Sequence, residues 1–240
     1  MFASSERTQK SIGTLGEKSL HAVLKRYYES DGSRHEIPVG SYIADIVGEN
    51  GIIEIQTRNF VKFKPKLTEL LNSARVTVVH PLINQKRIIN TEYGTGEVTS
   101  ARKSPKHGSV YTCIHELYAI KPLLSHPKLT IKLPVLCADE VRVYGVHTSR
   151  RRIQRTRRGE YISDIIPTDI IDEITLSCPD DYRIFLPPDL PAAFGSAQFA
   201  KAAKTDIHTA RRVLNLLHGM ELIEKTGKNG NKIIYTIKNT

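Results

Sequence analysis

The strongest pattern of apolar and polar positions lies between Tyr42 and Thr57. Two runs rich in isoleucine and valine flank Gly48-Glu49-Asn50-Gly51, and such a polar, glycine-bearing segment is a strong signal for a hairpin turn. If this segment forms the loop, Val47 faces Ile52 across the two strands. The pattern therefore predicts an antiparallel hairpin with a defined register.

Two acids interrupt these apolar runs. Counting back from the turn places Asp45 directly opposite Glu54, and the alternation of side chains along a strand puts both acids and Gln56 on one face. Carboxylates on neighbouring strands lie about 5 Å apart at Cβ and repel each other. Acids among so many apolar neighbours need a compensating charge, for which we favour a divalent metal ion. The alternatives are a slipped register and a solvated face of the sheet.

The periodicity on either side of the hairpin predicts the order α-β-β-β-α-β. Apolar residues at helical spacing predict helices over Gly16–Tyr28 and Val61–Ser73, and short strands are predicted over Arg34–Val39 and Arg75–Leu82. Because a helix connects the third strand to the fourth, these two strands should be parallel. The first helix is expected to bury Leu20, Val23, Leu24 and Tyr27, and the second to bury Phe63, Leu67, Leu70 and Leu71 while directing Lys62, Lys64 and Lys66 outward.

The middle of the chain is less regular. A strand is predicted over Lys86–Glu92, a basic loop over Gly94–Gly108, a helix over Val110–Leu124 and strand segments within Leu129–Tyr144. Together with the preceding elements, this order predicts a mixed α/β fold in which a central mixed sheet is flanked by helices.

A proline-rich stretch, Pro187–Pro191, marks a boundary before a more regular C-terminal segment. Helices are predicted over Ser196–Ala203 and Ile207–His218, followed by strands over Glu221–Lys225 and Lys232–Ile237. Two helices and a hairpin in this order are typical of a winged helix-turn-helix domain that binds DNA. The residues expected to contact a groove are His208, Thr209, Arg211, Arg212 and Asn215 on the second helix, with Lys228 and Lys232 at the wing. The alternative is a winged helix used for protein contacts or dimerisation.

The charge of the chain favours a polyanionic partner. The 35 Lys and Arg residues outnumber 25 Asp and Glu residues, which gives a net charge of +10. The most basic segment carries Arg150, Arg151, Arg152, Arg155, Arg157 and Arg158. We favour phosphate contacts for these arginines over a merely solvated loop, because the guanidinium group suits phosphate.

Other features of the sequence bear on the location and the domain organisation of the protein. No apolar run reaches the roughly 18 residues of a membrane span, so no membrane partner is expected. Three widely separated cysteines fit a reducing, cytoplasmic environment. We expect a flexible terminus over residues 1–12, a first domain over 13–146, a basic and then Pro-rich linker over 147–191, and a winged-helix domain over 192–240.

The hairpin motif resembles that of a known nuclease superfamily. Asp45, eight intervening residues and then Glu54-Ile55-Gln56, within the α-β-β-β-α-β order, resemble the PD-(D/E)xK superfamily of restriction-endonuclease-like nucleases. The resemblance covers about Gly13–Leu82 and includes Glu17 on the preceding helix. Two departures are Ala44 in place of the motif proline and Gln56 in place of the motif lysine. The whole chain also resembles a prokaryotic family that joins such a core to a C-terminal winged helix.

The resemblance implies a metal-dependent DNA endonuclease. Asp45, Glu54 and the backbone carbonyl of Ile55 would hold Mg²⁺ or Mn²⁺, Glu17 would complete the site, and Gln56 would orient the attacking water. Arg58, Lys62, Lys64 and the arginine segment would contact the DNA backbone. The alternative is a DNA-binding, regulatory protein that keeps the nuclease fold without the activity. The expected partner is DNA in the nucleoid, with RNA left open, and a double-strand break by one site per chain would favour a homodimer.

Overall fold

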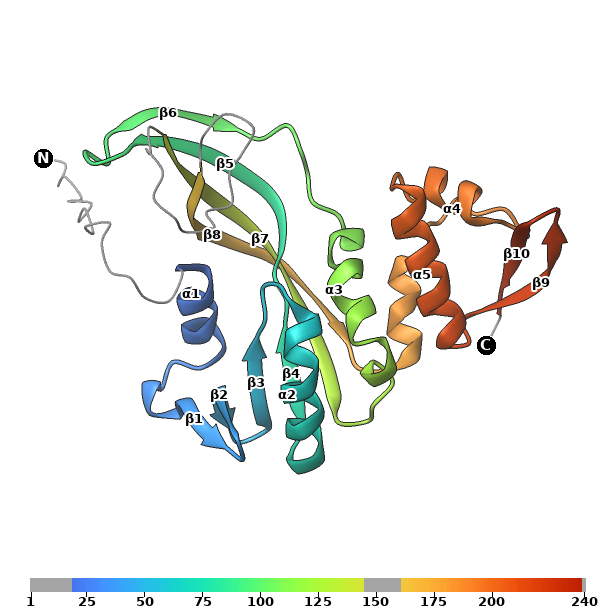
Figure 1. Ribbon diagram of the computed structural model, residues 1–240, viewed down its shortest axis with the longest axis horizontal. Coiled ribbons are helices and arrows are strands. Elements are labelled where there is room, and N and C mark those ends of the chain that lie inside the picture. Colours follow the sequence, from blue (N-terminus) through green and yellow to red (C-terminus); the bar gives the residue numbers. More distant parts are fainter. Residues whose placement is uncertain (1–18, 145–160, 239–240) are drawn as a thin grey trace, which may run out of the picture.

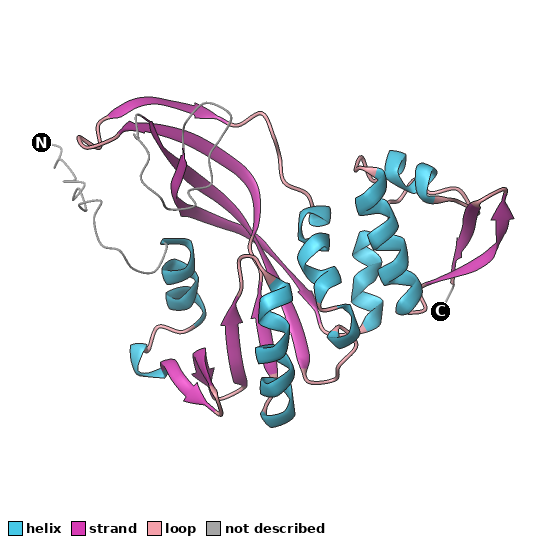
Figure 2. Ribbon diagram, in the orientation of Figure 1, coloured by secondary structure: helices cyan, strands magenta, loops and turns pink. Residues whose placement is uncertain are grey.

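The structure, a computed structural model, describes residues 19–144 and 161–238 (Figure 1). It is a mixed α/β fold whose central sheet is flanked by helices, as the sequence predicted (Figure 2). The helices are α1 (Ser19–Tyr28), α2 (Phe60–Ser73), α3 (Ile114–Ala119), α4 (Ser196–Ala202) and α5 (Ile207–Gly219). The strands are β1 (His35–Val39), β2 (Tyr42–Gly48), β3 (Gly51–Ile55), β4 (Val76–Val79), β5 (Leu82–Glu92), β6 (Val98–Lys103), β7 (Leu129–Tyr144), β8 (Tyr161–Leu176), β9 (Ile223–Asn229) and β10 (Lys232–Ile237).

Eight of these strands form one sheet around the long strand β7. The order of neighbouring strands in this sheet is β1-β2-β3-β4-β7-β5-β6. One edge of β7 pairs in parallel first with β4 and then with β5, whereas β8 runs antiparallel along its other edge. The parallel pairing of β3 with β4, predicted from the intervening helix, is confirmed.

The two faces of the sheet pack against different helices. On one face, α2 and α3 bury Leu67 and Leu117 in a large core that includes Ile52 and Val78. On the other face, α1 buries Leu24 in a smaller cluster with Ile46, Ile55 and Val79. Residues 52 and 55 thus belong to opposite faces, as alternation along β3 requires. The sheet edge formed by β1–β3 therefore lies between α1 and α2.

The burial of α1 differs from the prediction. Val23 is 40% exposed and Tyr27 is 58% exposed, although both were expected in the core. Tyr28 instead donates a hydrogen bond from its hydroxyl group to Glu173 on β8, and Lys25 is buried. The helix therefore turns a different face toward β8 than the spacing of its apolar residues predicted. A polar contact with that strand holds this face in place.

Two segments predicted to be irregular are strands. Part of the expected loop over 94–108 forms β6, whose side chains are all exposed. Most of the expected linker over 147–191 is structured, since 161–176 form β8 and Pro179–Phe185 form a 3-10 helix that buries Tyr182 and Phe185. The arginine segment of that linker lies outside the described residues.

The C-terminal elements share the large core of the sheet. Phe194, Phe199 and Leu214 are buried in the same cluster as Ile114 and Leu117 of α3. The order α4, α5, β9 and β10 matches the predicted elements, and β9 pairs with β10 across a turn at Gly230 and Asn231. The proline-rich stretch therefore does not interrupt the packing between α3 and α5 (Figure 1).

None of the helices within the described residues is long and apolar enough to cross a membrane.

Candidate functional site

The β2–β3 hairpin has the predicted register. Val47 pairs with Ile52 and Gly48 with Gly51, as counted from the turn. The regular pairing ends at Ile46 and Ile53, one position before the two acids. The strands diverge there, and we call the position of Asp45 and Glu54 the strand fork.

At the strand fork, side chains replace backbone pairing. The backbone N–H of Ile55 donates to Oδ2 of Asp45 at 2.8 Å, and the N–H of Asp45 donates to Oε1 of Glu54 at 3.3 Å. Each carboxylate therefore accepts a hydrogen bond from a backbone N–H of the opposite strand. This arrangement fixes both acids and holds them close together.

Glu54 is a buried carboxylate with a basic partner. Its side chain is 2% exposed, and its Oε2 lies 2.6 Å from Nζ of Lys66 on α2. Burial, together with the charge of Asp45, raises the pKa of Glu54 to about 7, although Lys66 opposes this rise. The carboxylate is thus poised between its protonated and ionised forms near neutral pH.

Lys66 was expected to point outward and instead points into the site. It lies three residues after Phe63 and four before Leu70, which are both buried. Residues at these spacings share a helix face, so the spacing itself carried the signal. Because Lys66 continues a series of lysines at every second position after Lys62 and Lys64, it was grouped with them as a residue that faces solvent.

Asp45 is more accessible than Glu54, and its side chain is 19% exposed. Its Oδ2 lies 3.3 Å from Nε2 of His21 on α1. Burial raises the pKa of Asp45, but hydrogen bonds from His21 and from the N–H of Ile55 outweigh it and lower the pKa overall. Asp45 therefore stays ionised while Glu54 titrates.

A third acid lies in the same row of the sheet. His35 pairs with Ile46 and Ile37 with Ala44, which places Glu36 next to Asp45 on the adjacent strand. Glu36 adopts a left-handed backbone (φ 56°), and its Oε1 lies 2.6 Å from Nζ of Lys25. Each of the three acids in this row therefore contacts one basic side chain that belongs to a helix. Sequence reasoning identified neither Glu36 nor the basic partners.

Gln56 does not point toward the acids in this structure. Its side-chain amide donates to the backbone carbonyl of Arg58. The backbone carbonyl oxygen of Gln56 lies 2.7 Å from Nδ1 of the buried His80. Burial lowers the pKa of this histidine. The predicted role of Gln56 in orienting water remains a prediction.

The strand fork offers a donor set that suits a hard cation. Two carboxylates share a site where burial and mutual repulsion disfavour a second negative charge, and a divalent ion relieves that repulsion. Within residues 19–144 and 161–238, however, no three His, Cys, Asp or Glu side chains group to hold a metal. An ion here would need Asp45, Glu54, the carbonyl of Ile55 and water. Glu17, which was predicted to complete the acidic site, lies outside the described residues.

The residues expected to contact DNA fall into two groups. Near the strand fork, Arg58 and Lys62 are exposed and Lys64 is half-buried. In the C-terminal segment, His208, Arg211, Lys228 and Lys232 are exposed, and Arg212 is half-buried. The six arginines between 150 and 158 lie outside the described residues.

Two residues expected on the free face of α5 are held within the protein. The hydroxyl group of Thr209 donates to Oδ2 of Asp206 at 2.6 Å, where Asp206 caps the helix. Oδ1 of Asn215 accepts from the hydroxyl group of Tyr118 at 3.1 Å and from Nζ of Lys121 at 2.6 Å. Asn215 thus contacts α3 and the segment after it, and Thr209 contacts the residue that caps its own helix. Their predicted contacts with DNA stay predictions.

The family match covers the sheet rather than the C-terminal elements. Residues 18–177, which include the strand fork and all eight strands of the sheet, match the family described as Domain of unknown function (DUF8091). A relative from Treponema pallidum (strain Nichols), named an uncharacterized protein, is 32% identical over 134 residues, or 55% of this chain and 53% of that protein. The chain therefore spans about half the length of this relative. No solved structure matches the chain. By its match over the sheet, the chain belongs to the DUF8091 family.

Proposed function

We propose that the protein is a metal-dependent DNA endonuclease built on a restriction-endonuclease-like core, with a C-terminal winged helix that binds DNA. The observation that carries this proposal is the strand fork. There two carboxylates on adjoining strands share a site with Lys66, a lysine that lies 2.6 Å from Glu54. Acids and a cation so arranged suit the hydrolysis of a phosphodiester.

Each residue of the strand fork has a distinct part in this proposal. Asp45 and Glu54, with the carbonyl of Ile55, would hold Mg²⁺ or Mn²⁺. The bound ion supplies Lewis acidity and lowers the pKa of a coordinated water. Gln56 stands in place of the motif lysine, and Lys66 on α2 instead supplies a positive charge at the strand fork. Its ammonium group would neutralise charge that develops on the phosphate.

Exposed cations beside the site support a nucleic-acid substrate. Arg58 and Lys62 lie at the start of α2, next to the end of β3 that carries Glu54. Arg211, Lys228 and Lys232 would bind the backbone through the C-terminal hairpin and α5. Such contacts are salt-sensitive and tolerant of sequence.

A second candidate is a DNA-binding protein without hydrolytic activity. It is favoured by the contacts at the strand fork, because His21 and Lys66 already lie against the two acids. The orientation of Gln56 toward Arg58 is also compatible with it. In this alternative the acids hold the hairpin between α1 and α2 and have no catalytic role.

Cleavage and binding measured on the same DNA separate the two candidates. Supercoiled plasmid is incubated with Mg²⁺ or Mn²⁺ and wild type, Asp45→Asn or Glu49→Gln. Glu49 is a matched control, because its exposed carboxylate pairs with Arg34 at the turn of the same hairpin. An endonuclease nicks plasmid with wild type and Glu49→Gln, and loses nicking with Asp45→Asn. Binding without cleavage by all three proteins favours the second candidate, and no binding at low salt contradicts both.

A further inference from the structure

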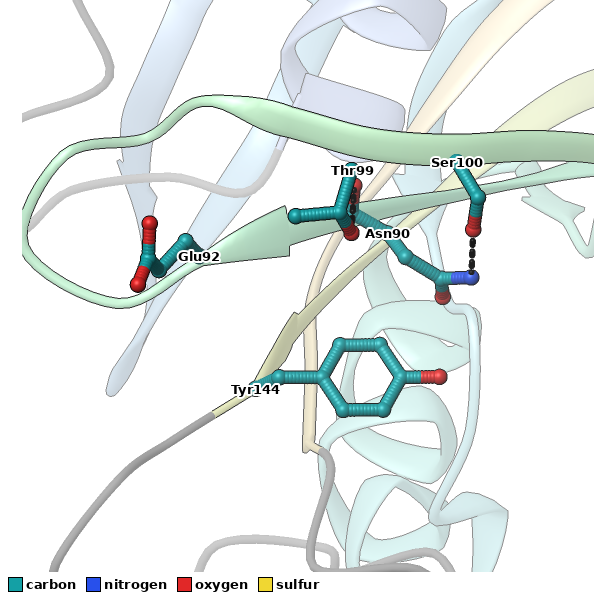
Figure 3. A pocket seen from close by; sticks show the side chains of 5 residues that line it. All are labelled: Asn90, Glu92, Thr99, Ser100 and Tyr144. Carbon is teal, nitrogen blue, oxygen red and sulfur yellow. Dashed lines mark hydrogen bonds between the residues drawn. The ribbon is translucent and has the colours of Figure 1, made fainter.

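A separate pocket lies at the far end of the sheet, between β5, β6 and β7 (Figure 3). It has a volume of about 380 Å³ and is lined by Asn90, Glu92, Thr99, Ser100 and Tyr144. This volume falls within the range of small-molecule sites.

The pocket is far from the strand fork. Asn90 pairs with Arg142 of β7, whereas Val78, the neighbour of Glu54, pairs with Ile131. At about 3.3 Å per residue, the intervening stretch of β7 spans roughly 36 Å. The pocket therefore belongs to a different part of the molecule.

Asn90 presents an unsatisfied acceptor to this pocket. The residue is 9% exposed, and its Nδ2 donates to Oγ of Ser100 at 2.7 Å. Its Oδ1 is buried and has no hydrogen-bond partner among the described residues. Figure 3 shows this oxygen directed toward the side of the pocket occupied by Tyr144. Buried acceptors are nearly always paired, so a ligand that donates a hydrogen bond would satisfy this one.

The other walls narrow the class of ligand. The ring of Tyr144 forms one side of the pocket and offers an aromatic face for stacking (Figure 3). The carboxylate of Glu92 is exposed at the rim and disfavours a phosphate group in the pocket itself. A planar ring with an amino group satisfies all three features.

We propose that this pocket binds a nucleobase with an exocyclic amino group, which donates to Oδ1 of Asn90 while the ring stacks on Tyr144. Adenine and cytosine carry such a group, and thymine does not. In a duplex each base is already stacked between its neighbours and cannot also stack on Tyr144, so only a base that has left the stack can enter the pocket. The base belongs either to an unpaired strand or to a free nucleotide. If the base belongs to an unpaired strand, the inference rests on the proposed nuclease function. The substrate of that enzyme would then contain a single-stranded segment.

Binding of labelled oligonucleotides tests the proposal without cleavage. Fluorescence anisotropy is measured in EDTA with dA12 and dT12, for wild type, Asn90→Leu, Tyr144→Ala and Asn72→Leu. Asn72 is a matched control, because it is exposed on α2. We expect wild type and Asn72→Leu to prefer dA12 by at least about fivefold, as one hydrogen bond of discrimination allows. In Asn90→Leu the preference should fall below about twofold with dT12 affinity unchanged, and Tyr144→Ala should weaken both oligonucleotides.

The wild-type comparison keeps the test decisive if a variant does not fold. Equal affinities for dA12 and dT12 in wild type, or a preference that survives in folded Asn90→Leu, would overturn the proposal. Competition by dAMP against dA12 identifies a free nucleotide as a sufficient ligand, and competition only by oligonucleotides identifies the strand. A preference for dA12 in a protein that does not nick plasmid supports this pocket and rejects the nuclease. Nicking without the preference does the reverse.

Discussion

Nζ of Lys66 lies 2.6 Å from Oε2 of Glu54, and this contact joins α2 to the diverging strands β2 and β3. The lysine is the basic group nearest to a carboxylate that is almost fully buried. It links the stability of the fold with the proposed chemistry, because both depend on how the charge of Glu54 is compensated.

Replacing Lys66 should destabilise the protein in a pH-dependent way. In Lys66→Met, Glu54 loses its partner, and a buried carboxylate without one is costly. We expect the free energy of unfolding at pH 8 to fall by about 2 kcal/mol. The loss should be smaller at pH 5, where Glu54 is protonated. Denaturant unfolding at both pH values measures this, with the exposed Lys62→Met as control. An equal loss for both lysines would show that the ion pair has no special role.

The raised pKa of Glu54 predicts how metal-free stability varies with pH. The folded-state value of about 7 exceeds the ordinary value of 4.5, so the folded protein holds a proton that the unfolded chain releases. The resulting stability is fully present below about pH 4.5 and is lost as the pH rises to about 7. Its size is about 3 kcal/mol, at roughly 1.4 kcal/mol per pKa unit.

Glu54→Gln should remove this dependence. Thermal melts of wild type and Glu54→Gln from pH 4.5 to 8 measure it, since other groups titrate equally in both proteins. We expect the difference in melting temperature to change in favour of the variant as the pH rises. A constant difference across the range would contradict a raised pKa for Glu54.

Two exposed residues of α5 should respond differently in DNA binding. Arg211 is exposed, so Arg211→Ala should weaken binding and reduce the slope of log affinity against log salt by about one. Asn215 is tied to Tyr118 and Lys121, so Asn215→Ala should lower the melting temperature with little change in that slope. Fluorescence anisotropy with duplex DNA over a salt series tests both. A larger slope change in Asn215→Ala than in Arg211→Ala would contradict the assignment of the DNA contact to Arg211.

The shared core predicts that the C-terminal elements do not melt separately. Phe199 is fully buried in the same cluster as Leu117 of α3. Phe199→Ala should lower the free energy of unfolding by about 3–5 kcal/mol, as large core truncations do. Calorimetry should give one transition for both wild type and variant. Two transitions, with only one shifted by the substitution, would show independent domains.

Local signals in the sequence determined much of the hairpin and its surroundings. The turn at 48–51 was enough to predict the register of β2 and β3, because the length of a hairpin loop fixes which residues of the two strands pair. The helix after β3 was enough to predict the parallel pairing with β4. These features depend on neighbours that are close in sequence.

What the sequence did not reveal depends on distant partners. Strand β6 has no buried side chain, so no apolar alternation marks it, and its structure comes from pairing with β5. The acids of β8 suggested a linker, but Glu173 meets Tyr28 and Lys132 across the fold. Lys66, His21 and Lys25 escaped notice because their carboxylate partners lie on other elements. Asn90 has no sequence signal at all, since its unpaired oxygen exists only in three dimensions.

The most direct test is a calorimetric titration of the metal-free protein with Mn²⁺ at pH 8, where Glu54 is ionised. Wild type and Glu49→Gln are predicted to bind Mn²⁺ with equal affinity, and Asp45→Asn and Glu54→Gln to bind at least about tenfold more weakly, a loss of about 1.4 kcal/mol. Mn²⁺ binding that is absent from wild type, or unchanged in Asp45→Asn, would contradict a metal centre at the strand fork.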